Sequence, residues 1–344
     1  MNLLERFFPY DHRPEHNRAL DGLRGLAVLL VLFGHATNQG LTPWLEGTLL
    51  ARGKLGVYLF FLISAYLLDK QIIQVWQHGK GNASYWRYYI GRRIMRIFPP
   101  FFLALITFRL MNESGYNVVI RDWSHVWEHL ALQRGDHIFW SIPTEFRYYI
   151  LSPLLLLFCY RFFKFHPTKT LVLLNVLFVL FANLAMSVDW PRHSTLRYLS
   201  IFLVGTFMAA WEMLQPKSFD TIKNHKALNA VGVLAIVGFG VWGSMAEDFT
   251  APWVYPPAAF LWSILLLWSF QKSFWGQFLS LKLLRFIGTI SYSLYLFHIP
   301  VLMWVKSLDL NNAVAFPAFL ALSIVVAALL HLLVERPALS LVKK

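Results

Sequence analysis

Two ionisable side chains, Arg24 and His35, lie within the first long apolar segment of the 344-residue chain. They are eleven positions apart, which is about three turns of an α-helix, so both side chains fall on one stripe. A guanidinium at the middle of a membrane helix costs about 2.5–3.5 kcal/mol, so it needs a partner or a hydrated cavity. An imidazole on the same stripe is a candidate general base. The pair therefore predicts a functional site inside a membrane.

The composition of the chain predicts a membrane protein. Hydrophobic residues make up 57% and charged residues only 14%, with a mean hydropathy of +0.50. Soluble domains carry about 25% charged residues. The apolar runs predict about ten transmembrane helices, at residues 22–37, 55–73, 94–111, 141–160, 170–188, 196–214, 227–245, 253–270, 285–306 and 313–334. We expect an all-α polytopic bundle in which residues 1–344 form a single membrane domain, with no appended soluble domain.

The distribution of positive charge predicts the orientation. The net charge is +13, and most of the 31 lysines and arginines fall in alternate loops when the N-terminus is placed in the cytoplasm. The positive-inside rule therefore predicts two cytoplasmic termini. Most of this charge anchors the helices, so no nucleic-acid partner is expected. The single cysteine excludes an intramolecular disulfide, and no ligand spacing indicates a metal site.

One loop carries more positive charge than anchoring requires. Arg87, Arg92, Arg93 and Arg96 cluster just before Phe98-Pro99-Pro100, at the start of the third predicted span. Guanidinium groups bind phosphates through paired hydrogen bonds, and a cluster at the membrane surface also suits anionic lipid head groups. On charge alone, phosphate binding, lipid binding and simple anchoring all remain open.

Polar residues also interrupt the fourth predicted span. Because this helix enters from the outer side, Glu145 lies near its outer end, at a depth similar to that of His35. A carboxylate beside an imidazole orients and tunes a general base. Tyr149 follows at i+4 and shares the face of Glu145. The alternative is that Glu145 only neutralises Arg147 or another buried arginine.

The ninth predicted span carries a second polar stripe. Ser291, Tyr295 and His298 recur at i, i+4 and i+7, so this face suits the interior of the bundle. Hydrogen bonding between helices and contact with a substrate explain this stripe equally well.

The motifs together resemble the acyltransferase-3 family of membrane proteins, which O-acylate glycans and other acceptors in bacterial envelopes. The resemblance runs nearly end to end and rests on six segments in order. These are Arg24 with His35, the Gly56–Ser64 segment, Arg92-Arg93-x-x-Arg96 followed by Pro99, Trp140-Ser141 with Glu145 and Tyr149, the Ser291–Pro300 segment, and Glu335-Arg336-Pro337. Two positions depart from the family pattern: Tyr58 stands where aspartate is usual, and Ala65 stands where glycine is usual.

The resemblance implies an activity and a division of roles. An acyl-CoA, expected to be acetyl-CoA, would place its phosphates on Arg92, Arg93, Arg96 and Arg24 at the cytoplasmic face of the bacterial inner membrane. His35, assisted by Glu145, would deprotonate an acceptor hydroxyl, and Arg24 belongs to the same catalytic set. Oxyanion or substrate contacts would come from the polar side chains of Ser64, Tyr149, Ser291, Tyr295 and His298. A covalent acyl-His35 relay is the alternative.

The acceptor is the least determined partner. An envelope glycan is the family's commonest acceptor, and a lipid or a small metabolite is the runner-up. A transporter or flippase would also be a basic polytopic bundle, but it more often shows matching halves, which are not evident here. A non-catalytic protein that binds anionic lipids would use the arginines without needing His35 opposite Glu145. Neither the length of the acyl chain nor the oligomeric state can be predicted from the residues.

Overall fold

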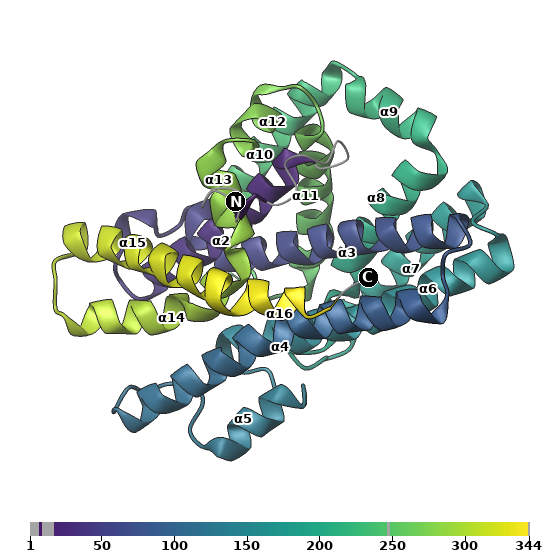
Figure 1. Ribbon diagram of the computed structural model, residues 1–344. Helices are drawn as coiled ribbons and strands as arrows, with labels where there is room; N and C mark the ends of the chain where they lie inside the picture. The colour runs from purple at the N-terminus through teal and green to yellow at the C-terminus, as the bar shows by residue number, and fades with distance from the viewer. Residues whose placement is uncertain (1–6, 9–16, 246–247, 343–344) are drawn as a thin grey trace.

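A computed structural model describes residues 7–8, 17–245 and 248–342 of the chain (Figure 1). Within these ranges the secondary structure consists of α-helices, short 3₁₀ turns and one π-helical turn, without strands. This confirms the predicted all-α fold. Most of the predicted cytoplasmic N-terminal segment, and the last two residues, lie outside the described ranges.

Each predicted span has a helical counterpart. The long helices are α2 (Arg18–Asn38), α3 (Gly53–Gln77), α4 (Ala83–Glu113), α6 (Ser141–Phe163), α7 (Pro167–Ser187), α8 (Thr195–Leu214), α10 (Ala227–Met245), α11 (Tyr255–Ser269), α14 (Ser291–Ser307) and α15 (Asn312–Leu330). The shorter ones are α5 (Trp123–Leu130), α9 (Pro216–Asn224), α12 (Phe274–Leu279), α13 (Lys282–Thr289) and α16 (Arg336–Ser340). By length and composition, seven described helices can cross a membrane, or nine if two bent pairs each count as one span. The buried α11, with 15 residues, is the remaining predicted segment.

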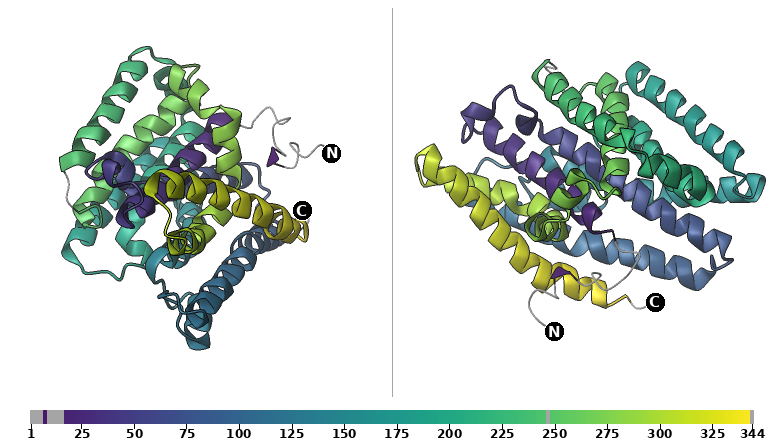
Figure 2. Two further views of the ribbon diagram at one scale, coloured as in Figure 1. Left: turned by 90° about the vertical axis from the view of Figure 1, so that its left-hand side faces the viewer. Right: turned by 90° about the horizontal axis from the view of Figure 1, so that it is seen from above.

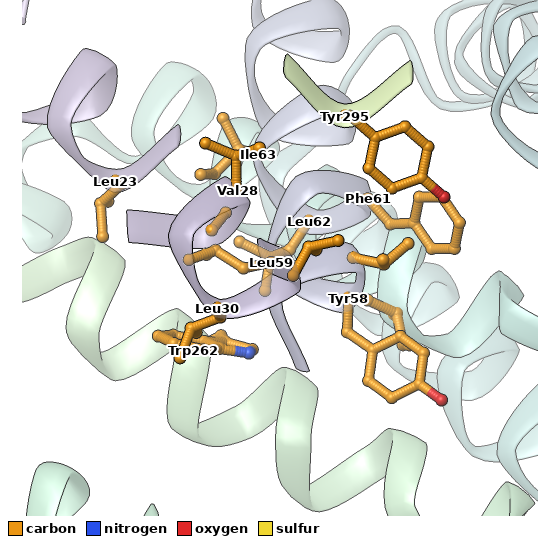
Figure 3. Close-up of a cluster of buried hydrophobic side chains, with 14 of the residues drawn as sticks. Leu23, Val28, Leu30, Tyr58, Leu59, Phe61, Leu62, Ile63, Trp262 and Tyr295 are labelled. Carbon is orange, nitrogen blue, oxygen red and sulfur yellow. The ribbon is translucent and has the colours of Figure 1, made fainter. Parts of the chain in front are cut away.

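Helix α2 lies at the centre of the arrangement and packs against α3, α13 and α14. Its first turn is capped by Asn17, whose side chain accepts a hydrogen bond from the Ala19 amide at 2.9 Å. Buried side chains of α2, α3, α11 and α14, among them Leu30, Leu62 and Trp262, form one apolar cluster (Figure 3). The helix that carries Arg24 and His35 is therefore fixed on several sides.

Glycines allow α2 and α13 to approach until their backbones touch. A Cβ atom at Gly25 would lie 2.1 Å from the carbonyl oxygen of Leu284, and one at Gly288 would lie 1.8 Å from that of Asp21. Such distances require the backbone to move, because a carbonyl cannot rotate away as a flexible side chain can. Small residues at helix contacts allow this close packing in membranes.

Replacing Gly288 with alanine should therefore destabilise the bundle. We expect a loss of about 1–3 kcal/mol, the usual cost of overpacking, because the added methyl group must displace Asp21. The thermal unfolding midpoint in detergent measures the loss. The matched control is Gly240→Ala on α10, where a Cβ atom meets nothing within 4 Å. Equal midpoints for the two variants would contradict the packing argument.

The ninth predicted span is broken rather than continuous. Helices α13 and α14 meet at Ile290 with a bend of 78°. Glu335, in the π-helical turn His331–Glu335, accepts hydrogen bonds from the backbone amide of Ser293, at 2.9 Å, and from its hydroxyl. A carboxylate thus satisfies free donors in the first turn of α14. Because of this break, Ser291 is the first residue of α14, and it lies beside Arg24.

Helix α4 lies at the edge of the bundle, with α5 beyond it and α16 crossing its middle (Figures 1 and 2). Only 33% of its most apolar window is buried within the protein. The arginine cluster of α4 nevertheless faces inward, as described below. The peripheral position of α4 leaves a space between this helix and the central α2 and α3.

Candidate functional site

A cavity of about 1500 Å³ opens between α2, α3, α4, α6 and α14. Nine of the eleven predicted site residues line it: Arg24, Ser64, Arg92, Arg93, Arg96, Glu145, Tyr149, Ser291 and Tyr295. These residues come from segments far apart in the sequence, so the fold brings together what the motifs predicted. The other two, His35 and His298, are not part of the cavity wall.

One end of the cavity is strongly basic. The guanidinium group of Arg93 lies over the rings of Tyr89 and Tyr149, at 5.4 and 5.1 Å from their centroids, and that of Arg92 lies 5.6 Å from the Tyr88 centroid. None of Arg92, Arg93 and Arg96 has a carboxylate at ion-pair distance among the residues that the structure describes. These three guanidinium groups line the cavity without an ion-paired carboxylate of their own, an arrangement that suits the binding of an anion.

Two hydroxyl groups hold the carboxylate of Glu145. Ser64 and Tyr149 both donate to its Oε1 atom, the latter at 2.5 Å. Arg147 instead donates to the backbone carbonyls of His193 and Leu132, at 2.8 and 2.6 Å. Glu145 therefore has hydroxyl partners, and Arg147 serves to anchor loops.

Arg24 and the polar stripe of α14 form the opposite wall. The guanidinium group of Arg24 donates to Ser291 at 3.2 Å. Ser141 donates to the hydroxyl of Tyr295 at 2.9 Å, and Tyr295 donates to the carbonyl of Ile138 at 2.5 Å. Ser141 was not among the predicted site residues, although the motif that begins at Trp140 contains it. The stripe thus makes contacts between helices, and two of its residues, Ser291 and Tyr295, also line the cavity.

His35 lies against other imidazoles rather than against Glu145. Its ring centroid is 5.1 Å from that of His298 and 5.6 Å from that of His137. No hydrogen bond joins His35 to Glu145 in the described part of the chain, so the predicted pairing is not a direct contact. Sequence spacing gave no reason to single out His137, and only the tertiary structure places it here.

The tautomer of His298 follows from its surroundings. Nδ1 lies 2.7 Å from the carbonyl oxygen of Tyr295, which can only accept, so we assign the proton to Nδ1. Nε2 is buried and has no hydrogen-bond partner in the ranges that the structure covers. Within those ranges, no group of three or more His, Cys, Asp and Glu side chains has the geometry to hold a metal ion.

The two departures from the family pattern lie on the buried face of α3. Tyr58 donates a hydrogen bond to the carbonyl of Phe249 at 2.7 Å, and its ring packs edge-on against Tyr255. Ala65 faces Gly205 of α8. A Cβ atom added at Gly205 would lie 2.8 Å from the Cβ atom of Ala65. Neither residue lines the large cavity. The changed positions thus affect packing between α3 and its neighbours, and not the wall that holds Arg93 and Glu145.

Comparison with known proteins identifies the family of this chain. The acyltransferase-3 family, described as an acyltransferase domain, matches residues 17–332. O-acetyltransferase OatA of Staphylococcus aureus strain NCTC 8325 is 25% identical over 333 residues, covering 86% of this chain and 52% of the relative. A protein with the provisional name O-acetyltransferase SAS0844, from strain MSSA476, is 26% identical and covers 98% of this chain and 59% of the relative.

The chain thus spans little more than half the length of these curated relatives. No solved structure matches it. The family match covers most of the described helices. The chain belongs to the acyltransferase-3 family of membrane proteins.

Proposed function

We propose that this domain transfers an acetyl group from acetyl-CoA to a hydroxyl of an envelope glycan. One observation carries the proposal: a single cavity connects three arginines without a counter-charge to the carboxylate of Glu145 and the hydroxyls around it. An acyl-CoA has the matching chemistry, with phosphates at one end and a reactive thioester at the other. The O-acetyltransferase relatives support the same reaction class.

The donor enters from the basic end of the cavity. Arg92, Arg93 and Arg96 bind its phosphates, and the pantetheine arm extends towards Ser64 and Glu145. Lys70 on α3, Lys223 on α9 and the loop residue Lys272 line the same cavity, and the first two are paired with Glu212 and Asp220. The segments around these lysines belong to the positively charged set, so we place this entrance in the cytoplasm.

His35 acts as the general base. It takes the proton of the acceptor hydroxyl as that oxygen attacks the thioester carbonyl carbon. The carbon–sulfur bond then breaks, and the leaving thiolate receives the proton from His35. Ser291 lines the same cavity, and its hydroxyl, which accepts from Arg24 and donates to no other described residue, stabilises the oxyanion. Glu145 assists by accepting hydrogen bonds from Ser64 and Tyr149, which fixes these hydroxyls in the cavity.

The reaction is tested with membranes that contain the wild-type protein and acetyl-CoA labelled in its acetyl group. Glycan, lipid and small-molecule fractions are separated and counted, with His35→Ala membranes in parallel. Label that enters glycan only with the wild type supports the proposal. Label in the lipid or small-molecule fraction would identify a different acceptor. If no fraction gains label with any of several acyl-CoA donors, the protein does not transfer acyl groups.

Glu145→Gln should lower turnover by about 10- to 100-fold. The amide keeps the shape of the side chain but removes the charge, and hydrogen bonds to charged groups contribute about 1.5–3 kcal/mol. Both Ser64 and Tyr149 lose their charged acceptor. The control is Glu113→Gln, which removes a carboxylate paired with Arg109 near the end of α4. Unchanged turnover in Glu145→Gln would show that its charge has no part in the reaction.

A further inference from the structure

His137 opens the 3₁₀ turn His137–Trp140 and lies beside His35. The three neighbouring imidazoles differ in exposure: His298 is fully buried, His35 is partly exposed, and His137 is exposed. Exposure thus rises from His298 through His35 to His137. His35 does not line the donor cavity.

The backbone holds His137 in an unfavourable conformation. Its φ angle is +50°, in the left-handed region that residues other than glycine rarely adopt. Such a conformation costs about 1–3 kcal/mol, and strained residues of this kind cluster at functional sites. Leu132, in the same loop, also has a positive φ angle, of 59°, so the loop follows a tightly turned path into His137.

A rigid hydrogen-bond network fixes the preceding residues. The amide of Asp136 donates to Nε2 of the buried His129 at 3.2 Å, while Nδ1 of His129 lies 2.7 Å from the carbonyl of His125. Burial lowers the pKa of His129, which keeps the ring neutral so that Nε2 can accept. Arg134 joins Asp136 to Glu128. These hydrogen bonds therefore hold the backbone just before His137 in place.

His35 then lies between two approaches. On one side, Tyr295 lines the donor cavity and lies one turn before His298 on α14, and His298 contacts His35. On the other side, His137 contacts His35 and is open to the exterior. His137 thus provides an approach to His35 that does not pass through the donor cavity.

We propose that His137 positions the acceptor hydroxyl against His35, at an entrance separate from the donor cavity. A neutral imidazole offers one N–H donor and one acceptor nitrogen, which matches a sugar hydroxyl that donates and accepts. His137 is a positioning residue, because the acceptor proton passes to His35. This inference rests on the proposed acetyl transfer to a glycan.

Kinetics separate positioning from general damage. His137→Asn retains a residue type that tolerates the left-handed conformation, and His137→Phe retains a ring. We expect both to raise the KM for the acceptor about tenfold, the effect of one hydrogen bond. The KM for acetyl-CoA and the slow hydrolysis of acetyl-CoA by water should stay within twofold. His125→Gln, in the same loop region, should change neither KM.

Two kinetic outcomes would overturn the proposal. If His137→Phe restores the wild-type acceptor KM, the ring serves only in packing. If acceptor KM and donor KM rise together in His137→Asn, the loop supports the whole site and not the acceptor.

Side-specific labelling tests the two entrances without relying on transfer activity. The native Cys159 is buried, so His137→Cys and Gln74→Cys each introduce one accessible thiol. Gln74 lines the basic end of the cavity. With a membrane-impermeant maleimide, we expect His137→Cys to react in intact cells and Gln74→Cys only in inverted vesicles.

Labelling of both variants from one side overturns the inference. If instead Gln74→Cys reacts in intact cells and His137→Cys only in inverted vesicles, the two entrances are separate but the basic end does not face the cytoplasm. If labelling occurs from opposite sides while the wild type transfers no acetyl group, the proposed function fails and the two-entrance geometry stands.

Discussion

Replacing His35 with alanine is expected to lower acetyl transfer about 10²- to 10⁴-fold, the range that a positioned general base contributes. The side chain contacts the rings of His298 and His137 and is partly exposed. Its loss therefore removes little buried packing, and folded protein should be recovered in normal amounts. Turnover is measured with saturating acetyl-CoA and acceptor.

The control for this loss is His78→Ala. His78 is exposed at the end of α3, and its Nδ1 atom contacts the carbonyl of Gln74 in its own helix. Its replacement should leave transfer and elution volume unchanged. Near-normal transfer by the His35 variant would contradict the assignment of His35 as base.

The same variant distinguishes the two possible roles of His35. In the general-base mechanism, the protein carries no acetyl group when acceptor is left out. In the covalent alternative, acetyl label accumulates on the wild-type protein and not on His35→Ala. Acid-quenched, acceptor-free reactions followed by denaturing gel analysis measure this label.

The positions of the helices could be predicted from the sequence, because an apolar run long enough to span a membrane has few alternatives to a helix. The break between α13 and α14 could not be predicted in this way. Gly288, Thr289 and Ile290 continue the apolar run, and the bend depends on Glu335 from a distant turn. The count of ten spans likewise includes α11, which is shorter than a typical spanning helix.

The site could be predicted as a set of residues but not as a set of contacts. The depth of Glu145 along its helix follows from residue counting, whereas its direction around the helix depends on how α6 packs against α3. That packing places its carboxylate on Ser64, and the packing of α2 against α14 brings His35 to His298. His137 escaped prediction because its position depends on a left-handed backbone angle and on a loop fixed by His129.

Arg93→Ala should raise the KM for acetyl-CoA about 10- to 100-fold, because hydrogen bonds between charged groups contribute about 1.5–3 kcal/mol. The KM for the acceptor should not change. Arg93 is the best-placed member of the cluster, since its guanidinium group is held between the rings of Tyr89 and Tyr149 and faces the cavity. Steady-state kinetics with each substrate varied in turn measure both constants.

Arg93→Lys separates charge from shape. Lysine keeps the positive charge but lacks the planar group that stacks between two rings and bonds a phosphate through two nitrogens. We therefore expect a donor KM between those of the wild type and Arg93→Ala. Arg161→Ala, an exposed arginine near the end of α6 that does not line the cavity, is the control for net charge. If Arg161→Ala raises the donor KM as much as Arg93→Ala does, general attraction at the membrane surface explains donor binding, and the cavity is not the donor site.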